Sequence, residues 1–162
     1  MIDTGAVIDT RALIDGVKEN RSIPSSTVIP VLVYPDVVAA SEWIVATLGF
    51  RERLRIGDGH RTQLSYGDGA VIVAEASHGR RAPDADDPDD PTHSVTVRVE
   101  DAWSHFEHAQ SAGAAIESGP ADMEFGERQY NVVDPWGHHW TFSESIADKA
   151  PEDWGGTAID LS

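Results

Sequence analysis

Residues 31–50 read VLVYPDVVAASEWIVATLGF, and residues 97–114 read VRVEDAWSHFEHAQSAGA. Each stretch starts with an apolar segment of strand composition, passes through an aspartate (Asp36 or Asp101), and reaches a glycine just before its end. Aspartate is a preferred N-cap of a helix, and glycine commonly follows the last helical residue. The two stretches therefore predict the same strand and helix twice, which indicates an internal duplication.

Short strand-like segments follow each predicted helix and are separated by turn formers such as Gly67-Asp68-Gly69 and Asp134-Pro135-Trp136-Gly137. In the first half they are residues 50–56, 61–66 and 70–75, and in the second half residues 114–118, 128–133 and 138–143. We therefore expect an α+β fold of two βαβββ modules, whose curved mixed sheets surround a cleft and carry the helices on one face.

The chain divides into parts of different composition. We predict an N-terminal extension (1–27), a first module (28–77), an acidic linker (78–92), a second module (93–145) and a C-terminal tail (146–162). The extension has a weak helical pattern over residues 10–20. The linker contains GRRAPDADDPDDP, in which no apolar residue is larger than alanine, so it is predicted to be a loop without a packed core.

Charge and composition argue against several classes of protein, namely nucleic-acid binding, disulfide-bonded and membrane proteins. The formal net charge is −16, which repels nucleic-acid phosphates, so we expect no nucleic-acid partner. The chain has no cysteine, which excludes disulfides and thiolate chemistry and fits a reducing compartment. We find no apolar run of about 18 residues and no basic segment followed by an apolar one near Met1. We therefore expect a cytoplasmic protein that does not enter membranes.

Residues 130–142, YNVVDPWGHHWTF, follow Phe125-Gly126-Glu127-Arg128. This segment resembles the closing strands of bleomycin-resistance-like members of the glyoxalase/bleomycin-resistance/dioxygenase (vicinal oxygen chelate) superfamily, and residues 31–50 and 97–114 resemble the opening strand and helix of its modules. The resemblance covers about residues 28–145. It implies a homodimer, or modules paired within one chain, with a small organic ligand in a cleft between two curved sheets.

Catalytic members of this superfamily hold a metal ion with His, Gln or Glu near the start of each first strand and Glu in each last strand. Here Ser94 stands at one such position with His93 out of phase, Thr141 replaces a carboxylate, and Glu75 lies at a strand end. Three or four ligands must converge on a divalent metal. The residues therefore favour a protein without metal or cofactor. The alternative is a metal-dependent lyase, isomerase or dioxygenase that uses Zn, Ni, Mn or Fe.

Alternation along the strands predicts which side chains face the ligand. Val95, Val97 and Val99 alternate with polar residues, so the valines are expected to meet the helix. Trp140 and Phe142 are expected on the same helix-facing side. We predict that the ligand contacts polar residues of the opposite face, namely Ser94, Thr96, Arg98, His139 and Thr141, and, with less certain facing, Gln63 and Tyr130.

The remaining aromatic and histidine residues are interpreted as structural. His105 and His108 are expected on a solvated helix surface, His138 in a turn, and Trp43 and Trp103 in packing or dimer contacts. The chain has no nucleophile elbow and no phosphate-binding glycine loop before a helix.

The leading hypothesis is a metal-independent small-molecule binding protein of the bleomycin-resistance type, which would confer antibiotic resistance by sequestering a drug. The metal-dependent enzyme is the second hypothesis. The third is a protein-interaction module that docks a partner through the acidic linker or the tail around Trp154.

Overall fold

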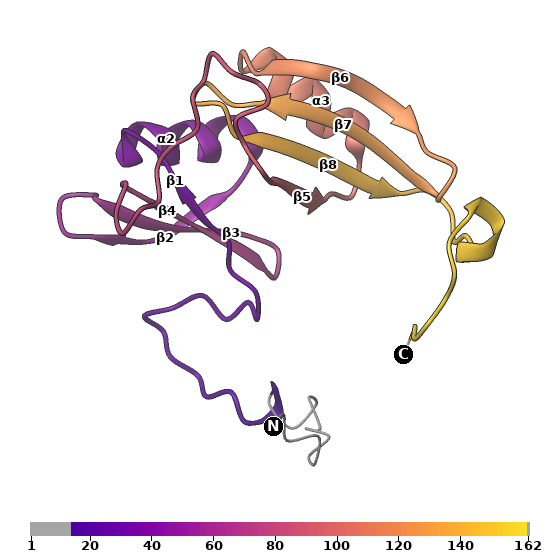
Figure 1. The fold of residues 1–162 in the computed structure, drawn as a ribbon, viewed down its shortest axis with the longest axis horizontal. Coiled ribbons are helices and arrows are strands. Elements are labelled where there is room, and N and C mark those ends of the chain that lie inside the picture. The colour runs from indigo at the N-terminus through magenta and orange to yellow at the C-terminus, as the bar shows by residue number, and fades with distance from the viewer. Residues whose placement is uncertain (1–13, 162) are drawn as a thin grey trace, which may run out of the picture.

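The computed structural model describes residues 14–161. Two four-stranded mixed sheets form the fold (Figure 1). The first has the order β1 (Val31–Val33), β4 (Gly69–Ala74), β3 (Arg61–Tyr66), β2 (Arg51–Ile56). The second has the order β5 (Ser94–Arg98), β8 (His139–Ser145), β7 (Glu127–Val133), β6 (Ala115–Asp122). In each sheet the first strand pairs in parallel with the last, which confirms the α+β fold of two βαβββ modules.

Each module carries one helix that begins at the predicted aspartate. Helix α2 (Val37–Trp43) starts where the Asp36 carboxylate accepts the Ala39 N–H at 3.0 Å, and α3 (Ala102–Ser111) starts where Asp101 accepts the Ser104 N–H at 3.0 Å. These bonds satisfy backbone donors of the first turn. Helix α2 continues as a π-helical stretch, η1 (Ile44–Leu48), and both modules then turn at a glycine with positive φ, as predicted.

The helices cover the same side of both sheets, and we call this side the inner face of each sheet and the opposite side the outer face. The inner faces share one hydrophobic core that includes Leu32, Leu64, Val97, Trp140 and Phe142. The predicted core positions of Val97, Val99, Trp140 and Phe142 are therefore confirmed. Because this core unites both modules, the outer faces are left for other contacts.

Two strands differ in length from the prediction. Strand β1 is shorter than the apolar run at 28–34, because Pro30 and Pro35 flank it and proline has no N–H for the sheet ladder. Strand β6 is longer and runs through Gly119 and Pro120. It lies at the sheet edge and has register shifts near Ser118, so a proline is tolerated there.

A buried carboxylate joins the two modules. Asp134, in the turn before β8, accepts the hydroxyl of Tyr34 at 2.6 Å and the indole N–H of Trp140 at 3.1 Å. It also accepts the backbone N–H groups of Trp136 and His138. Burial, followed by the Asp134 charge, raises the pKa of Tyr34 well above its ordinary value, so Tyr34 remains a donor. The carboxylate therefore ties β1 of the first module to β8 of the second.

Histidines of the second module bind carbonyl groups of the first. His105 Nε2 donates to Leu48 O at 2.9 Å, His108 Nε2 to Ala46 O at 2.8 Å, and His138 Nε2 to Val33 O at 2.7 Å. The prediction of a solvated surface for His105 is therefore wrong. Its ring also stacks on Phe142. Its Nε2 bonds the Leu48 carbonyl at the π-helical end of η1, where carbonyls need donors from a neighbouring element.

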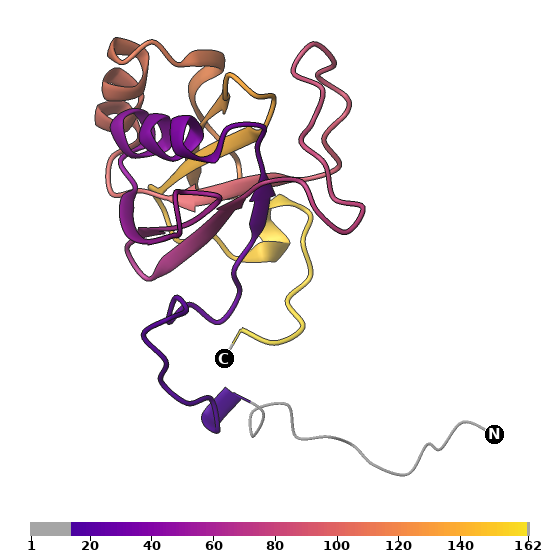
Figure 2. The ribbon, with the colours of Figure 1, turned by 90° about the vertical axis from the view of Figure 1, so that its left-hand side faces the viewer.

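The linker and the tail form ordered appendages. Figure 2 shows the linker as a long loop beside the sheets. The loop is closed by a bidentate pair between Arg81 and Asp90, which holds the pKa of Asp90 below its usual range. In the tail, Trp154 packs its ring against Phe125 at a centroid distance of 5.5 Å. The helix predicted over 10–20 lies partly outside the described residues; within the described part, Ile14 and Asp15 are helical and residues 17–20 are not.

Candidate ligand-binding site

The outer face of the second sheet is polar. In the parallel pairing of β5 and β8, Ser94 lies beside His139, and Thr96 lies beside Thr141. Residues on either side of them along the strands, such as Val95 and Trp140, belong to or pack against the core. The alternation therefore turns the predicted polar residues outward, as expected.

A hollow of about 410 Å³ opens on this face. Three of the predicted ligand contacts, Ser94, His139 and Thr141, lie in it together. It is lined in addition by Pro88, Pro91, Thr92, His93, Glu117 and Asn131. Prolines of the linker thus form one wall, and side chains of β5, β6, β7 and β8 form the others.

Hydrogen bonds orient the polar groups of this hollow. Thr141 Oγ1 donates to Asn131 Oδ1 at 2.6 Å, and Asn131 Nδ2 donates to Ser118 Oγ at 2.6 Å. His139 Nδ1 lies 3.4 Å from Glu117 Oε2, whereas His139 Nε2 is buried and has no hydrogen-bond partner. A buried polar atom without a partner is costly, so it marks a place where a further group is expected.

Two other predicted residues lie in a second hollow of about 390 Å³, at the edge where β5 approaches the β3–β4 hairpin. Thr96 and Arg98 lie on its rim, and its walls include the rings of Phe50 and Tyr66. Arg98 Nη2 donates to Ser145 Oγ at 3.0 Å. Burial raises the pKa of Tyr66, which stays protonated. The predicted site is therefore divided between two hollows.

Gln63 and Tyr130 lie elsewhere. Tyr130 is fully buried on the inner face, where its hydroxyl binds His105 Nδ1 and its ring stacks on Phe142. Its predicted outward facing is wrong, because Tyr130 has the same strand parity as the core residue Val132. Gln63 does point to the outer face, but to that of the first sheet, where it is only 4% exposed.

The donors for a metal ion do not converge. Within residues 14–161, no three His, Asp or Glu side chains gather where they could hold an ion. The rings of His93 and His138 are 6.0 Å apart, but His138 donates to a backbone carbonyl. Glu75 is exposed beyond the end of β4. These residues do not fit the metal site that the family resemblance implies for its enzymes.

Sequence reasoning missed Glu117 and Asn131 as companions of His139. Asn131 alternates with Tyr130 and Val132 along β7, so the parity of the strand was a usable signal. Glu117 sits at an irregularity of an edge strand, where alternation gives no reliable facing. Within residues 14–161, no helix has the length and hydropathy to cross a bilayer.

Comparison with known proteins places the chain in a family. Residues 27–142 match the Glyoxalase/Bleomycin resistance protein/Dioxygenase superfamily. Uncharacterized proteins of Mycobacterium bovis and Mycobacterium tuberculosis are 31% identical over 55 residues, which is 34% of this chain. The match spans only about a third of the length of these curated relatives (36% and 32%).

Solved structures agree with this placement. TioX from Micromonospora sp. ML1 is 33% identical, with a TM-score of 0.63 over 75% of this chain and 100% of that one. TnmS3, described as an antibiotic binding protein from Streptomyces sp. CB03234, is 19% identical, with a TM-score of 0.58 over 76% and 98% of the two chains. At the latter identity the likeness shows the fold alone. With the family match covering most of its length, this chain belongs to the glyoxalase/bleomycin resistance protein/dioxygenase superfamily.

Proposed function

We propose that this protein binds a small organic molecule on the outer face of its second sheet, without a metal ion, and thereby sequesters it. The observation that carries the proposal is the hollow of about 410 Å³ in which Ser94, His139 and Thr141 lie together. Small-molecule sites are concave surfaces with a few well-placed polar groups, and this hollow has that character.

The polar groups of the hollow suit recognition of a ligand by hydrogen bonds. Ser94 and His139 line the hollow, and Thr141 is held in place by Asn131. Held side chains lose little conformational entropy when a ligand binds, which favours affinity. TnmS3, which shares the fold, is described as an antibiotic binding protein, and this description supports an antibiotic-like ligand and a role in antibiotic resistance.

We infer further that the protein acts as a cytoplasmic homodimer. The inner faces of both sheets are buried in the shared core, so a cleft between two sheets requires a second copy of the chain. Trp103 is 48% exposed on α3 and packs its ring against Phe106 on the helix side of the second sheet, so it does not line this cleft. Sedimentation equilibrium at micromolar concentration tests the dimer, and a monomer would contradict it. Fractionation of the source cells tests the location.

A thermal-shift screen tests the binding function. The panel contains antibiotics, aromatic metabolites and divalent metal ions. A ligand at a hundredfold excess over its dissociation constant is expected to stabilise the fold by about 2.7 kcal/mol. Calorimetric titration of each hit then gives the dissociation constant and the stoichiometry. A panel without any hit would count against this function.

Substitutions in the hollow then locate the site. His139→Ala removes a side chain that lines the hollow and is expected to weaken binding about tenfold, with a smaller effect for Thr141→Val. His78→Asn, at an exposed loop position, is the matched control and is expected to leave affinity unchanged. If His139→Ala bound the hit as tightly as the parent protein, the ligand would lie elsewhere.

Metal analysis separates this function from the enzyme hypothesis. The protein is purified without chelator and its content of Zn, Ni, Mn and Fe is measured. Substoichiometric metal is expected. One equivalent of any of these metals, retained through dialysis, would contradict metal-independent binding and favour a lyase, isomerase or dioxygenase.

A further inference from the structure

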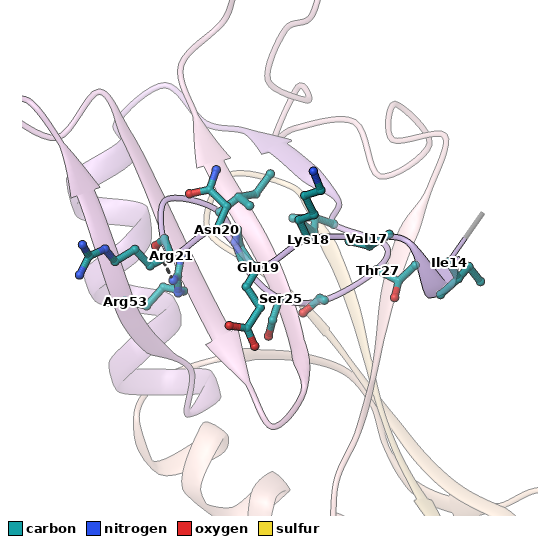
Figure 3. Close-up of a pocket in the computed structure, with 13 residues that line it drawn as sticks. Ile14, Val17, Lys18, Glu19, Asn20, Arg21, Ser25, Thr27 and Arg53 are labelled. Atoms are coloured by element: carbon teal, nitrogen blue, oxygen red, sulfur yellow. Dashed lines mark hydrogen bonds between the residues drawn. The ribbon is translucent and has the colours of Figure 1, made fainter. Parts of the chain in front are cut away.

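Residues 20–27, which we call the strap, cross the outer face of the first sheet before the chain enters β1 (Figure 3). Two side chains of this sheet hold the backbone of the strap. Gln63 Nε2 donates to Ser22 O at 2.9 Å, and Arg53 Nη2 donates to Arg21 O at 3.0 Å. At its far end, Ser26 Oγ donates to Asp68 O in the β3–β4 turn at 2.6 Å. The strap is therefore fixed at both ends.

The strap uses the polar groups that this face offers. Gln63 lies between Thr62 and Leu64, which both face the core, so its amide emerges on the outer face. Arg53 also donates to Gln63 Oε1. The amide and the guanidinium thus bind one another and two strap carbonyls. Any other molecule that used these groups would have to displace the strap.

Few apolar contacts hold the strap in place. Pro24 is buried, but Ile23 is 48% exposed and the other strap side chains are largely in solvent. A hollow of about 670 Å³ lies along the segment from Ile14 to Ile29, beside Arg53. A segment held by a few hydrogen bonds, with little buried apolar surface, opens at low free-energy cost.

We propose that the strap is a built-in competitor: it occupies the outer face of the first sheet and must leave before a small organic ligand can use that face. The proposal rests on the function proposed above and extends it, because it adds the outer face of the first sheet to the ligand-binding outer face of the second sheet. It assigns Gln63, a residue predicted to bind ligand, to the strap in the resting protein. Apparent affinity for this face is then reduced by the fraction of closed molecules.

Proteolysis measures strap opening without any ligand. Trypsin cleaves after Arg21 only when the chain around it is free to enter the protease. Arg53→Ala removes the bond to Arg21 O and the bond to Gln63, and is expected to raise the rate of cleavage at Arg21 about fivefold. Arg51→Ala is the matched control, because Arg51 is an exposed arginine of the same strand whose side chain does not hold the strap.

Locking the strap tests the competition itself. The chain has no cysteine, so Ser26→Cys with Asp68→Cys introduces one possible disulfide, whose formation is checked by mass spectrometry. Nile red, a neutral dye that fluoresces in apolar sites, serves as the probe. We expect the dye to bind the reduced protein about fivefold more tightly than the oxidised protein, and Arg53→Ala more tightly than both the parent protein and Arg51→Ala.

Each outcome decides the question. Equal dye affinity in the oxidised and reduced proteins would overturn the competition, even if Arg53→Ala speeds cleavage at Arg21. If the double-cysteine protein does not fold, the comparison of Arg53→Ala with Arg51→Ala decides alone. A failed ligand screen at His139 would overturn the proposed function, but it would leave the dye and protease results unchanged, so the two failures are distinguishable.

Discussion

The two sheets have the same topology, but the outer face of the first is apolar and the outer face of the second is polar. In the first sheet Val31 lies beside Ile72, whereas in the second Ser94 lies beside His139. The apolar face is covered, because Ile72 is buried and the strap crosses this face, held by Gln63 and Arg53. The polar face is open and holds the candidate site. Both modules keep an apolar inner face that packs against their helix, so only the outer faces are free to take different roles.

The turns before the last strands differ in the same way. Asp134 of the second module is buried and accepts four hydrogen bonds, whereas Asp68 of the first module is exposed. One turn therefore joins the modules and the other faces solvent. The two modules thus share a fold, but matching positions in them make different contacts. Paired substitutions at matching positions measure how much each contact stabilises the protein.

The largest expected effect comes from the two turn aspartates. Asp134→Ala leaves the donors of Tyr34 and Trp140 buried without a partner, and is expected to lower the free energy of unfolding by about 3–5 kcal/mol. Asp68→Ala keeps the carbonyl that binds Ser26 and is expected to cost less than about 0.5 kcal/mol. Urea unfolding measures both. Equal costs would mean that Asp134 does not join the modules.

The outer faces give the next largest effect. Ile72→Ala removes a buried side chain from the first sheet and is expected to cost about 2–4 kcal/mol. Thr141→Ala in the open hollow removes one hydrogen bond and is expected to cost about 1 kcal/mol or less. Thermal unfolding of both variants tests the contrast. An Ile72→Ala cost below that of Thr141→Ala would show that the first sheet is not covered in solution.

Most core positions of the two sheets could be predicted from sequence, whereas the contacts between the modules and the position of the strap could not. Val97 and Trp140 were placed correctly because strand alternation has a period of two and both modules repeat it. Tyr130 was placed on the wrong face because the register of β7 was uncertain by one residue, and a shift of one residue turns a side chain to the other face of the sheet. His105 was missed because its partner is the carbonyl of Leu48, 57 residues away. The strap could not be predicted, since Gln63 binds the backbone of Ser22 and backbone atoms leave no pattern in a sequence.

The glycines of the two matching turns give a smaller effect. Gly67 and Gly137 both have positive φ, so alanine at either is expected to cost about 1 kcal/mol in backbone strain. At Gly67 an added Cβ meets nothing, whereas at Gly137 it would lie 3.1 Å from Ala85 Cα of the linker. Gly137→Ala is therefore expected to cost about 1 kcal/mol more than Gly67→Ala, by urea unfolding. Equal costs would show that the linker is free to move away from this turn.

The smallest expected effect concerns the histidines through which the second module binds the first. Burial, the largest cause, lowers the pKa of His105 and of His138. Bonds to the carbonyls of Leu48 and Val33 act in the opposite direction, as does the Asp134 charge at His138. Each neutral ring donates its Nε2 proton to a carbonyl. A second proton on His105 would remove the nitrogen lone pair that faces the Tyr130 hydroxyl.

Stability is therefore expected to fall as the pH drops below about 6.5, the ordinary pKa of histidine. Below that pH the unfolded chain binds protons that the folded chain excludes, so the free energy of unfolding decreases with falling pH. We expect Tm to fall by about 1–2 °C between pH 7 and pH 5.5, before most carboxylates titrate. The double variant His105→Gln, His138→Gln is expected to have a lower Tm at pH 7 but a flatter profile, whereas His78→Asn keeps the parent slope. A double variant with the parent's slope would show that the pH dependence arises elsewhere than at the contact between the modules.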